Sequence, residues 1–253
     1  MSSILVGLIV FGCAFGAALA GIVLHGKLPA HHRDADSRDV VKLVMGLIAT
    51  IAALVLSLLI ATAHTSYETQ QSEVQALGLR IGQIDDLLAH YGPEAGEARS
   101  VLRQLVAGQL ARIWPDDGAA TVNLRAPIER EAGARFAQMV ADLPATTEAQ
   151  HFIKGRVLQL LVAIGDTRGL LYEQAGGSLA WPFFVVLIFW LVVLFLGFGY
   201  LTRPNATVVL SLFVGALSVA GAIFLILEMD RPYSGLMRIS SAPVRGALGP
   251  ISP

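Results

Sequence analysis

Long apolar segments alternate with polar segments along the chain, and this pattern sets the expected fold class. Each apolar run has about 20 residues, which at 1.5 Å of helix rise per residue crosses a hydrocarbon core of about 30 Å. Backbone amides in lipid need partners within their own segment, so each run is predicted to be a helix. The four runs are Ile4–Leu24, Val40–Ala63, Trp181–Leu201 and Ala206–Leu227.

The composition agrees with a membrane protein. Charged residues make up 15% of the chain and the mean hydropathy is +0.64, whereas soluble domains carry about 25% charged residues. The only charged residue in the four runs is Lys42, close enough to the start of the second for its amine to reach the headgroups. The net charge of −1 gives no indication of a nucleic-acid partner. We therefore expect an all-α membrane protein with four transmembrane helices.

A segment of soluble composition, residues 67–178, separates the second and third runs. From Thr69 its apolar positions recur every three or four residues, which predicts a helix that continues the second run without a break. Gly92 and Pro93 should end this helix, since glycine stops helices and proline starts them. The apolar positions of this seam are Val74, Leu77, Ile81, Ile84, Leu88 and Tyr91.

Three further helices are expected in the same segment. The first follows Pro93 and carries apolar residues as far as Ile113, and the second lies between Pro127 and Pro144. The third begins near Thr146–Glu148, where the sequence has a capping pattern. The expected domains are residues 1–66 with transmembrane helices 1 and 2, 67–178 as a helical cytoplasmic bundle, 179–229 with helices 3 and 4, and 230–253 as a C-terminal tail.

Catalytic and cofactor-binding motifs are missing from the sequence. It contains no G-x-S-x-G, no H-E-x-x-H and no glycine-rich phosphate loop, and the apolar runs hold no titratable cluster. Histidine and aspartate gather after the first run, but their spacing matches no known metal site and a hydrated loop explains them more simply. We expect no enzyme, no metal and no cofactor. The residues concerned are His25, His31, His32, Asp34, Asp36 and Asp39.

Small or weakly polar residues recur on one face of the second run. They step by three or four positions, and the remaining faces are mainly Leu, Ile and Val. One interpretation is close helix packing, because small side chains let backbones approach. The other is the wall of a pore, because small hydroxyl-bearing residues tolerate water. The candidate pore-lining residues are Gly46, Thr50, Ala53, Ser57, Ala61 and His64.

The other runs carry patterns that predict how they pack. The third run is rich in phenylalanine and is expected to form most of the lipid-facing wall. Small residues at four-residue spacing predict packing faces on the first and fourth runs. These are Gly12, Gly16 and Ala20 on the first, and Ala216 with Ala220 and Ser218 with Ala222 on the fourth.

The fourth run ends in three charged residues, Glu228, Asp230 and Arg231. Charges at the end of a span cost little, so a solvated or salt-bridged turn explains them. In an oligomer the same group would repeat around an axis, where rings of acids select cations and rings of arginine select anions. Both interpretations of this candidate cytoplasmic mouth remain open.

Charge alone does not decide the orientation, because five basic residues flank the membrane on each side. Four spans place both termini and residues 67–178 on the same side. Ala18-Leu19-Ala20 also fits a signal-sequence cleavage site, but no basic residue precedes the first run. The single cysteine, Cys13, excludes a disulfide within one chain.

Several longer stretches resemble an uncharacterised bacterial family described as bestrophin-like. They include "HHRDADSRDVVKLVMGLIATIAALVLSLLIATAHTSY", "IDDLLAHYGPEA", "PFFVVLIFWLVVLFLGFGYLTRPNATVVLSLFVGALSVAGAIFLILEMDRPYSGLMRISSAPV" and the Gln-Ala-Gly-Gly before the third run. The resemblance implies kinship with bestrophins, which are pentameric anion channels with four membrane helices per subunit. In them the second helix lines the pore, and both termini and the helical block lie in the cytosol.

The sequence also departs from bestrophins. The acidic calcium-binding run after the last span is absent, and the second run has no aromatic residue to form a neck. Calcium gating, ion selectivity and subunit number are therefore not carried over. The expectation is a homo-oligomeric ion channel, a pentamer by resemblance alone, in the bacterial inner membrane. Its partners would be lipid and ions, and the alternative is a non-conducting membrane scaffold or regulatory protein.

Overall fold

The computed structural model describes residues 2–27, 35–114, 128–174, 181–230, 233 and 235–247, and the regular elements in these ranges are helices. The chain divides into two compact units. The apolar unit contains residues 1–66 and 178–230, and the bundle unit contains residues 67–177 and 231–253. Helix α2 (Ala35–Tyr91) contributes to both, and the boundary within it falls between Ser66 and Tyr67.

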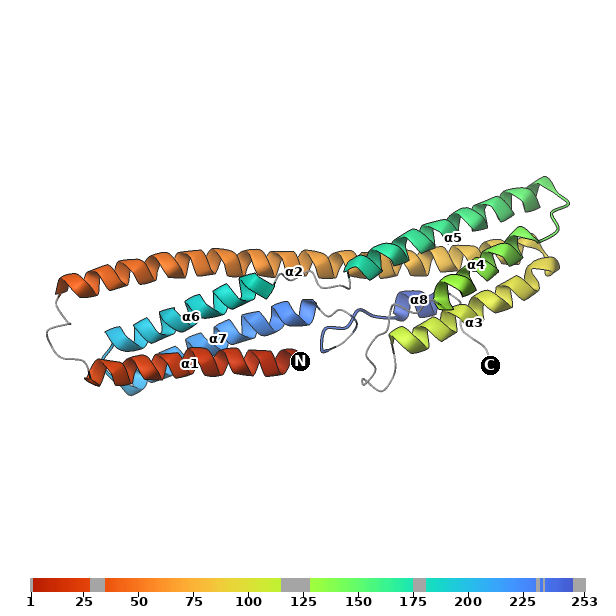
Figure 1. Ribbon diagram of the computed structural model, residues 1–253. Coiled ribbons are helices and arrows are strands. Elements are labelled where there is room, and N and C mark those ends of the chain that lie inside the picture. Colours follow the sequence, from red (N-terminus) through yellow and green to blue (C-terminus); the bar gives the residue numbers. More distant parts are fainter. Residues whose placement is uncertain are drawn as a thin grey trace. The chain divides into compact units, whose positions relative to one another are not determined.

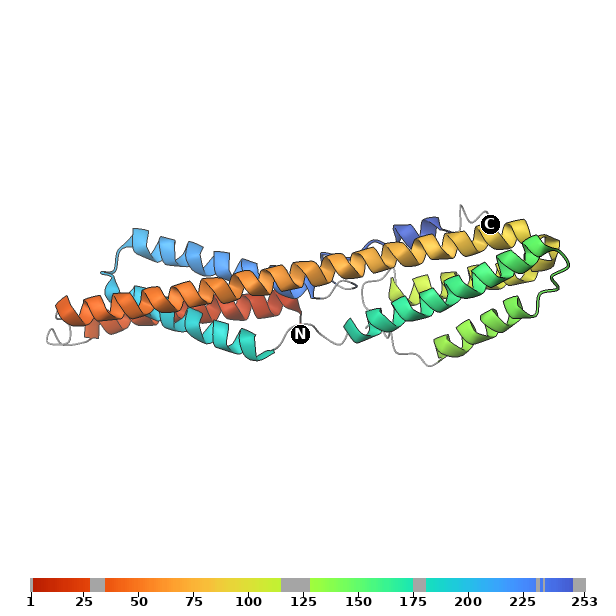
Figure 2. The ribbon, with the colours of Figure 1, turned by 90° about the horizontal axis from the view of Figure 1, so that it is seen from above.

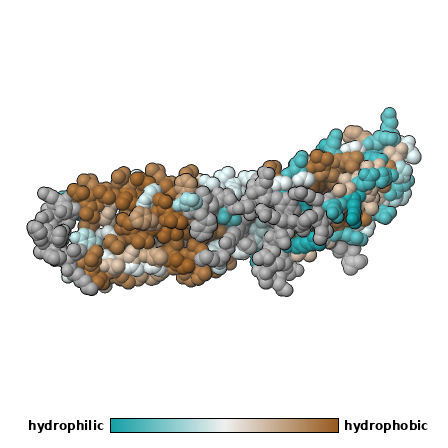
Figure 3. Space-filling model, in the orientation of Figure 1, coloured by the Kyte–Doolittle hydropathy of each residue, from teal (hydrophilic) through white to brown (hydrophobic). Residues whose placement is uncertain are grey.

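The apolar unit is built from α1 (Ser3–Lys27), the first part of α2, α6 (Trp181–Leu201) and α7 (Ala206–Met229). Its four helices are long and apolar enough to cross a membrane. Helix α1 packs against both α6 and α7 (Figures 1 and 2). The surface of this unit is mainly hydrophobic, whereas hydrophilic residues gather on the bundle unit (Figure 3). A mainly hydrophobic outer surface is typical of helices that lie in lipid.

Two glycines set the distance between α1 and α6. A Cβ atom on Gly21 would collide with the carbonyl oxygen of Leu196, and one on Gly199 would collide with that of Ala18. Ala14 and Ala18, on the same helix α1, are buried. The helices therefore approach closely enough for backbone to meet backbone, as small residues allow in membrane bundles.

This approach makes α6 the most enclosed of the four apolar helices within the protomer, whereas the sequence led us to expect a helix mainly exposed to lipid. Of its apolar window 39% is buried, against 17% for α2. Phe184 and Phe195 are buried, whereas Phe183 and Phe189 are exposed. The phenylalanines of α6 point in different directions, and α1 packs against one side of the helix.

The predicted packing face of α1 is not the face that packs within the protomer. Gly12, Gly16 and Ala20 are exposed. The inward face carries Val10, Ala14 and Ala18 instead. On α7 the prediction for Ala216 and Ala220 is confirmed, since both are buried, whereas Ser218 is exposed. Aromatic rings join α1 to α7, with Phe213 edge-on to Phe11 and Phe15 at centroid distances of 5.3 and 5.5 Å.

Helix α2 continues for 57 residues without interruption, as the unbroken seam predicted. No proline lies between its apolar and polar parts. Tyr91 is its last residue, and the next, Gly92, has φ = 124°. This left-handed conformation favours glycine, which explains why the helix ends there.

The bundle unit packs the second part of α2 with a 3₁₀ helix, η2 (Pro93–Ala95), and four α-helices. Its core includes Ile84, Leu88, Phe136, Val140 and Val157. Helix α3 packs against α4, and α4 against α5. The four helices are α3 (Gly96–Ile113), α4 (Ile128–Ala141), α5 (Glu148–Gln174) and α8 (Ala242–Gly246).

Helix α5 begins with a reciprocal cap. The backbone N–H of Thr147 donates to Oε1 of Gln150 at 3.2 Å, and the backbone N–H of Gln150 donates to Oγ1 of Thr147 at 3.2 Å. This is the capping-box arrangement, which satisfies N–H groups that a helix start leaves without partners.

The residues after α7 contribute to the bundle core. Ile239 and Val244 are buried there. A Cβ atom on Gly78 would lie 2.6 Å from the carbonyl oxygen of Pro243, so the glycine lets α8 approach the backbone of α2. The segment expected to be a C-terminal tail therefore supplies packed side chains to this unit.

Candidate functional site

The first candidate site is the small-residue face of α2. Its six residues are all exposed in the protomer: Gly46, Thr50, Ala53, Ser57, Ala61 and His64. The residues that α2 buries against its own unit are Met45, Ala52, Leu59 and Ala63. The sequence pattern thus marks a real face, and the protomer does not cover it.

This face is narrow and weakly polar. The hydroxyl of Thr50 donates to the carbonyl oxygen of Gly46 at 2.9 Å, within the helix. That bond satisfies the hydroxyl proton and leaves an oxygen that accepts hydrogen bonds on the exposed side. The side chains of this face from Gly46 to Ala61 are short, so water or another helix can come close to the α2 backbone on this side.

A second exposed side of α2 differs from the first in size and polarity. Leu43, Leu47, Leu54 and Leu58 are exposed there, at 61–74% of their full area. At about 100° per residue these leucines lie beside the small-residue face, away from the buried side. Uncovered leucine at this density suits lipid, whereas the small-residue face offers lipid little apolar area. The two exposed sides therefore favour different neighbours.

The second candidate site is the end of α7. Glu228 is only 4% exposed, and Met229 beside it is also buried. The backbone N–H of Asp230 donates to the carbonyl oxygen of Ile226 at 3.1 Å and ends the helix. Arg231 lies outside the described residues. A carboxylate as buried as that of Glu228 is turned into the protomer, whereas the α2 face is turned outward.

The histidine-rich loop is only partly described. His25 lies at the end of α1, with its Nδ1 2.7 Å from the carbonyl oxygen of Tyr200, and so joins α1 to α6. His31, His32 and Asp34 lie outside the described residues, as does the side chain of Asp36. Among the residues that the structure describes, no three His, Cys, Asp or Glu side chains are grouped to hold a metal ion.

The sequence analysis missed a buried ion pair in the bundle unit. Asp85 of α2 accepts two hydrogen bonds from Arg99 of α3, at 2.7 and 2.8 Å, and one from Arg103 at 3.3 Å. The hydrogen bond from Arg99 is the main cause that lowers the pKa of Asp85, and burial opposes it. The same bond raises the pKa of Arg99. Asp85 directly follows Ile84, an apolar residue of the seam, and this position was the sign in the sequence that its carboxylate could be buried.

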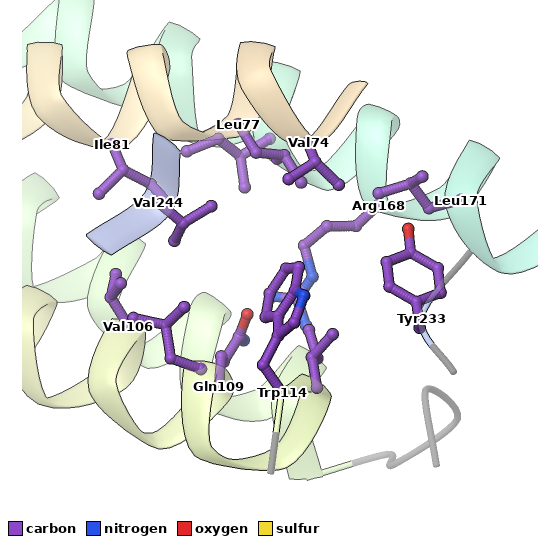
Figure 4. A pocket seen from close by; sticks show the side chains of 13 residues that line it. Val74, Leu77, Ile81, Val106, Gln109, Trp114, Arg168, Leu171, Tyr233 and Val244 are labelled. Carbon is purple, nitrogen blue, oxygen red and sulfur yellow. The ribbon is translucent and has the colours of Figure 1, made fainter. Parts of the chain in front are cut away.

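A pocket in the bundle unit was also missed. Its walls come from α2, α3, α5, α8 and Tyr233 (Figure 4). Its cavity volume is about 80 Å³. Thirteen residues from separated segments line it, so no local pattern in the sequence could have indicated it. They are Val74, Leu77, Ile81, Val106, Gln109, Leu110, Ile113, Trp114, Ile164, Arg168, Leu171, Tyr233 and Val244.

Polar groups gather at one part of this pocket. With the Gln109 amide oriented to satisfy its hydrogen bonds, its oxygen accepts from both terminal nitrogens of Arg168 at 3.0 Å. The indole N–H of Trp114 donates to the carbonyl oxygen of Ile239 at 2.8 Å. Burial, with a smaller effect from Glu73, raises the pKa of Tyr233 to about 12, so its hydroxyl remains protonated at neutral pH.

The described fold and its long apolar helices define an all-helical membrane protein. The chain belongs to the bestrophin-like family: the family model described as Bestrophin-like domain matches residues 12–244. The match includes both units, so the family pattern extends beyond the apolar helices. Comparison with curated proteins and with solved structures found no match. The family expected from the sequence is therefore confirmed.

Proposed function

We propose that this protein is an oligomeric ion channel of the bacterial inner membrane whose pore is lined by α2. The observation that carries the proposal is the exposure of all six residues of the small-residue face. Four membrane helices are too few to enclose a hydrated path, so subunits would share it. In such an assembly the leucine-rich side of α2 would meet lipid or a neighbouring subunit, and the small-residue face would meet water.

The proposed topology has four membrane spans, with both termini and residues 67–178 in the cytoplasm. The number of apolar helices supports the spans, and membership of the bestrophin-like family supports the orientation. The proposal involves no catalytic step and no cofactor, and it does not assign the ion.

The competing function is a non-conducting scaffold or regulatory partner. It would use the small-residue face for helix packing and the seam of α2 for association. However, Val74, Ile84 and Leu88 of that seam are buried in the core of their own protomer. The seam is therefore occupied, and this favours the channel over the scaffold.

Reconstitution in planar bilayers tests the channel. Purified protein should conduct, and Ser57→Trp should reduce single-channel conductance at least severalfold, because indole would fill a shared path. Leu58→Trp is the matched control, since it places the same indole at the next residue, on the leucine-rich side. Absence of conductance for any ion, over a range of voltage and pH, would refute the proposal. Equal effects of the two substitutions on conductance would show that the small-residue face of α2 does not line the pore.

The group at the end of α7 is proposed to be structural, because Glu228 is buried. Glu228→Gln should lower the stability of the oligomer and leave ion selectivity unchanged. Asp230→Asn is the companion variant, at a half-buried residue that directly follows the last residue of α7. A change in reversal potential under an ion gradient would instead place these carboxylates at an ion filter.

A further inference from the structure

The segment between α7 and α8 exposes two apolar side chains beside an arginine. Leu236 is 77% exposed and Met237 37%, and Arg238 follows them, also exposed. We propose that this docking segment, residues 235–238, inserts into the interface of an anionic bilayer. Leu236 and Met237 reach the acyl boundary, and Arg238 binds lipid phosphate. The inference needs the apolar helices to lie in a membrane but does not depend on conduction, so the two proposals fail separately.

The exposure of these side chains belongs to the folded bundle unit, because the chain is held on both sides of them. Before them, Tyr233 packs against the bundle core, with its ring edge-on to Trp114 at a centroid distance of 6.0 Å (Figure 4). After them, Ile239 is buried, and its carbonyl oxygen accepts the indole N–H of Trp114 at 2.8 Å. Between these attachments Gly235 has φ = 102°, a left-handed conformation that turns the chain sharply. The docking segment therefore projects from a fixed base.

The place of the docking segment along the chain keeps it near the membrane. The fourth apolar helix, α7, ends at Met229, and Leu236 follows seven residues later. An extended chain covers at most about 3.6 Å per residue, so Leu236 lies within about 25 Å of the end of α7. The headgroup layer begins where a membrane helix ends. An exposed leucine is ordinary on a protein surface, but this one has an apolar phase within reach.

The charge of this part of the chain favours an anionic surface. The described residues 235–247 include Arg238 and Arg245 but no aspartate or glutamate. Basic residues close to a membrane span are attracted to anionic lipid. The Nε of Arg238 donates to the carbonyl oxygen of Gly235 at 3.2 Å, which holds the guanidinium beside the two apolar side chains. Arginine also binds phosphate oxygens with parallel N–H donors.

The combination of side chains suits a lipid interface in particular. Interfacial segments place apolar side chains about 5–10 Å into the boundary between headgroups and acyl chains, with basic side chains at the headgroups. Leu236 and Met237 supply the first part, and Arg238 supplies the second. Two copies of the segment that met each other would bring their arginines together, and like charges oppose such a contact. Lipid is therefore a better partner than the same segment of a second copy.

The experiment places an environment-sensitive nitrobenzoxadiazole (NBD) group on the docking segment of the full-length protein. Cys13→Ser removes the only native cysteine, and Leu236→Cys supplies the thiol that is labelled. The nanodiscs contain equal parts of phosphatidylcholine and phosphatidylglycerol, with or without a phosphatidylcholine that carries a nitroxide near the top of its acyl chain. We expect blue-shifted NBD emission and roughly twofold or stronger quenching by the nitroxide, since the probe lies at the acyl boundary.

Phe152→Cys is the matched control for the position of the probe. Phe152 is also apolar and exposed, at 73%. Its near neighbour Gln150 donates to the carbonyl oxygen of Tyr91, the last residue of α2, at 3.3 Å. Tyr91 is about 36 Å along α2 from Tyr67, the residue with which the helix enters the bundle unit. NBD at position 152 should emit as it does in water and should not be quenched.

A second arm tests the charge of the docking segment. With the probe at position 236, NBD lifetimes give the ratio of inserted to free segment. Arg238→Gln should lower this ratio roughly fivefold, the effect of one basic residue at an anionic surface. Arg156→Gln, at an exposed arginine of α5, should leave the ratio unchanged. Nanodiscs of phosphatidylcholine alone should lower the ratio in the parent and remove the effect of Arg238→Gln.

A third arm tests the apolar contact. With the probe moved to Met237→Cys, Leu236→Ala should lower the inserted ratio about threefold or more, because it removes apolar area from the acyl boundary. Leu79→Ala removes the same area from another exposed leucine of the bundle unit and should have no effect. Thermal unfolding in the same nanodiscs verifies that each variant is folded.

Three results would overturn the proposal. Emission from position 236 that matches water, without quenching, would show that the docking segment lies in solvent. Blue-shifted emission without quenching would show that protein covers it, from a second copy or from the same chain. Equal quenching at positions 236 and 152 would show that the label itself seeks lipid.

Discussion

The two parts of α2 bury their side chains in different ways. In the bundle unit α2 places Val74, Ile84 and Leu88 in a core that its own protomer completes. In the apolar unit the same helix buries Met45, Leu59 and two alanines, and leaves most of its surface uncovered. One continuous helix therefore has its apolar side chains covered by the rest of the protomer in the bundle unit. In the apolar unit its exposed apolar side chains need lipid or further subunits to cover them. This difference places the candidate pore face in the apolar unit.

The largest expected effect compares cysteines placed along α2. In a Cys13→Ser background, which removes the only native cysteine, Ser57→Cys should react quickly with a charged, water-soluble thiosulfonate if its face meets water. Leu58→Cys and Val74→Cys should react roughly tenfold or more slowly, because lipid or a packed core disfavours the reactive thiolate. Stopped-time labelling and mass spectrometry measure the rates. Equal rates at positions 57 and 58 would contradict a hydrated face.

The next largest effect tests how closely the apolar unit packs. Gly199→Ala should destabilise the protein by roughly 1–3 kcal/mol, because its Cβ would collide with the backbone of α1. Gly221→Ala, on α7, is the control, since a Cβ there meets nothing within 4 Å. It should be neutral or slightly stabilising. Unfolding in nanodiscs, followed by circular dichroism, compares them. A neutral Gly199→Ala would show that α1 and α6 are farther apart than described.

A third prediction tests the ion pair that the bundle unit buries. Asp85→Asn should cost about 1–3 kcal/mol, less than a fully buried pair, because Arg99 and Arg103 are partly exposed. The exposed neighbour gives the control Asp86→Asn, which should change stability by less than about 0.5 kcal/mol. Denaturation at pH 7 measures both. Similar losses from the two variants would mean that the ion pair contributes nothing of its own.

The same pair predicts a pH dependence. The pKa of Asp85 in the folded protein is lowered from its ordinary value of 3.8 by the hydrogen bonds from Arg99 and Arg103. Its contribution is therefore present above about pH 4, and it is lost as the pH falls through the lowered folded value. Asp85→Asn should remove that part of the acid destabilisation, so the difference from the parent should shrink below pH 4. A difference that stays constant down to strong acid would contradict the assignment.

The smallest effect concerns a single hydrogen bond of the bundle core. The hydroxyl of Tyr91 donates to the carbonyl oxygen of Pro144 at 3.1 Å and ties the end of α2 to the connection between α4 and α5. Tyr91→Phe should cost about 0.5–1.5 kcal/mol. Tyr67→Phe, elsewhere on α2, serves as a comparison for loss of a hydroxyl. A loss above about 3 kcal/mol would indicate a larger role for Tyr91 than this one bond.

The helices and the α2 face were predictable because their signals are local. Apolar length and three-to-four spacing indicate where a helix begins and ends and which of its residues share a face. The pocket was not predictable, because Val74, Gln109, Arg168 and Tyr233 are far apart in the chain. Nor was the partner of Asp85, since a carboxylate in a seam gives no sign of which arginine approaches it.

By itself the sequence determined that this is a helical, four-run, bestrophin-like chain with a small-residue face on its second run. Those properties depend on neighbours within a few turns of helix. Only the tertiary structure decided that α1 turns Ala14 and Ala18 inward in place of Gly12 and Gly16, that α6 is enclosed, and that Glu228 is buried. Each of these depends on how closely two backbones approach. That distance is set by contacts between segments, such as Gly199 against Ala18, which no single stretch of sequence contains.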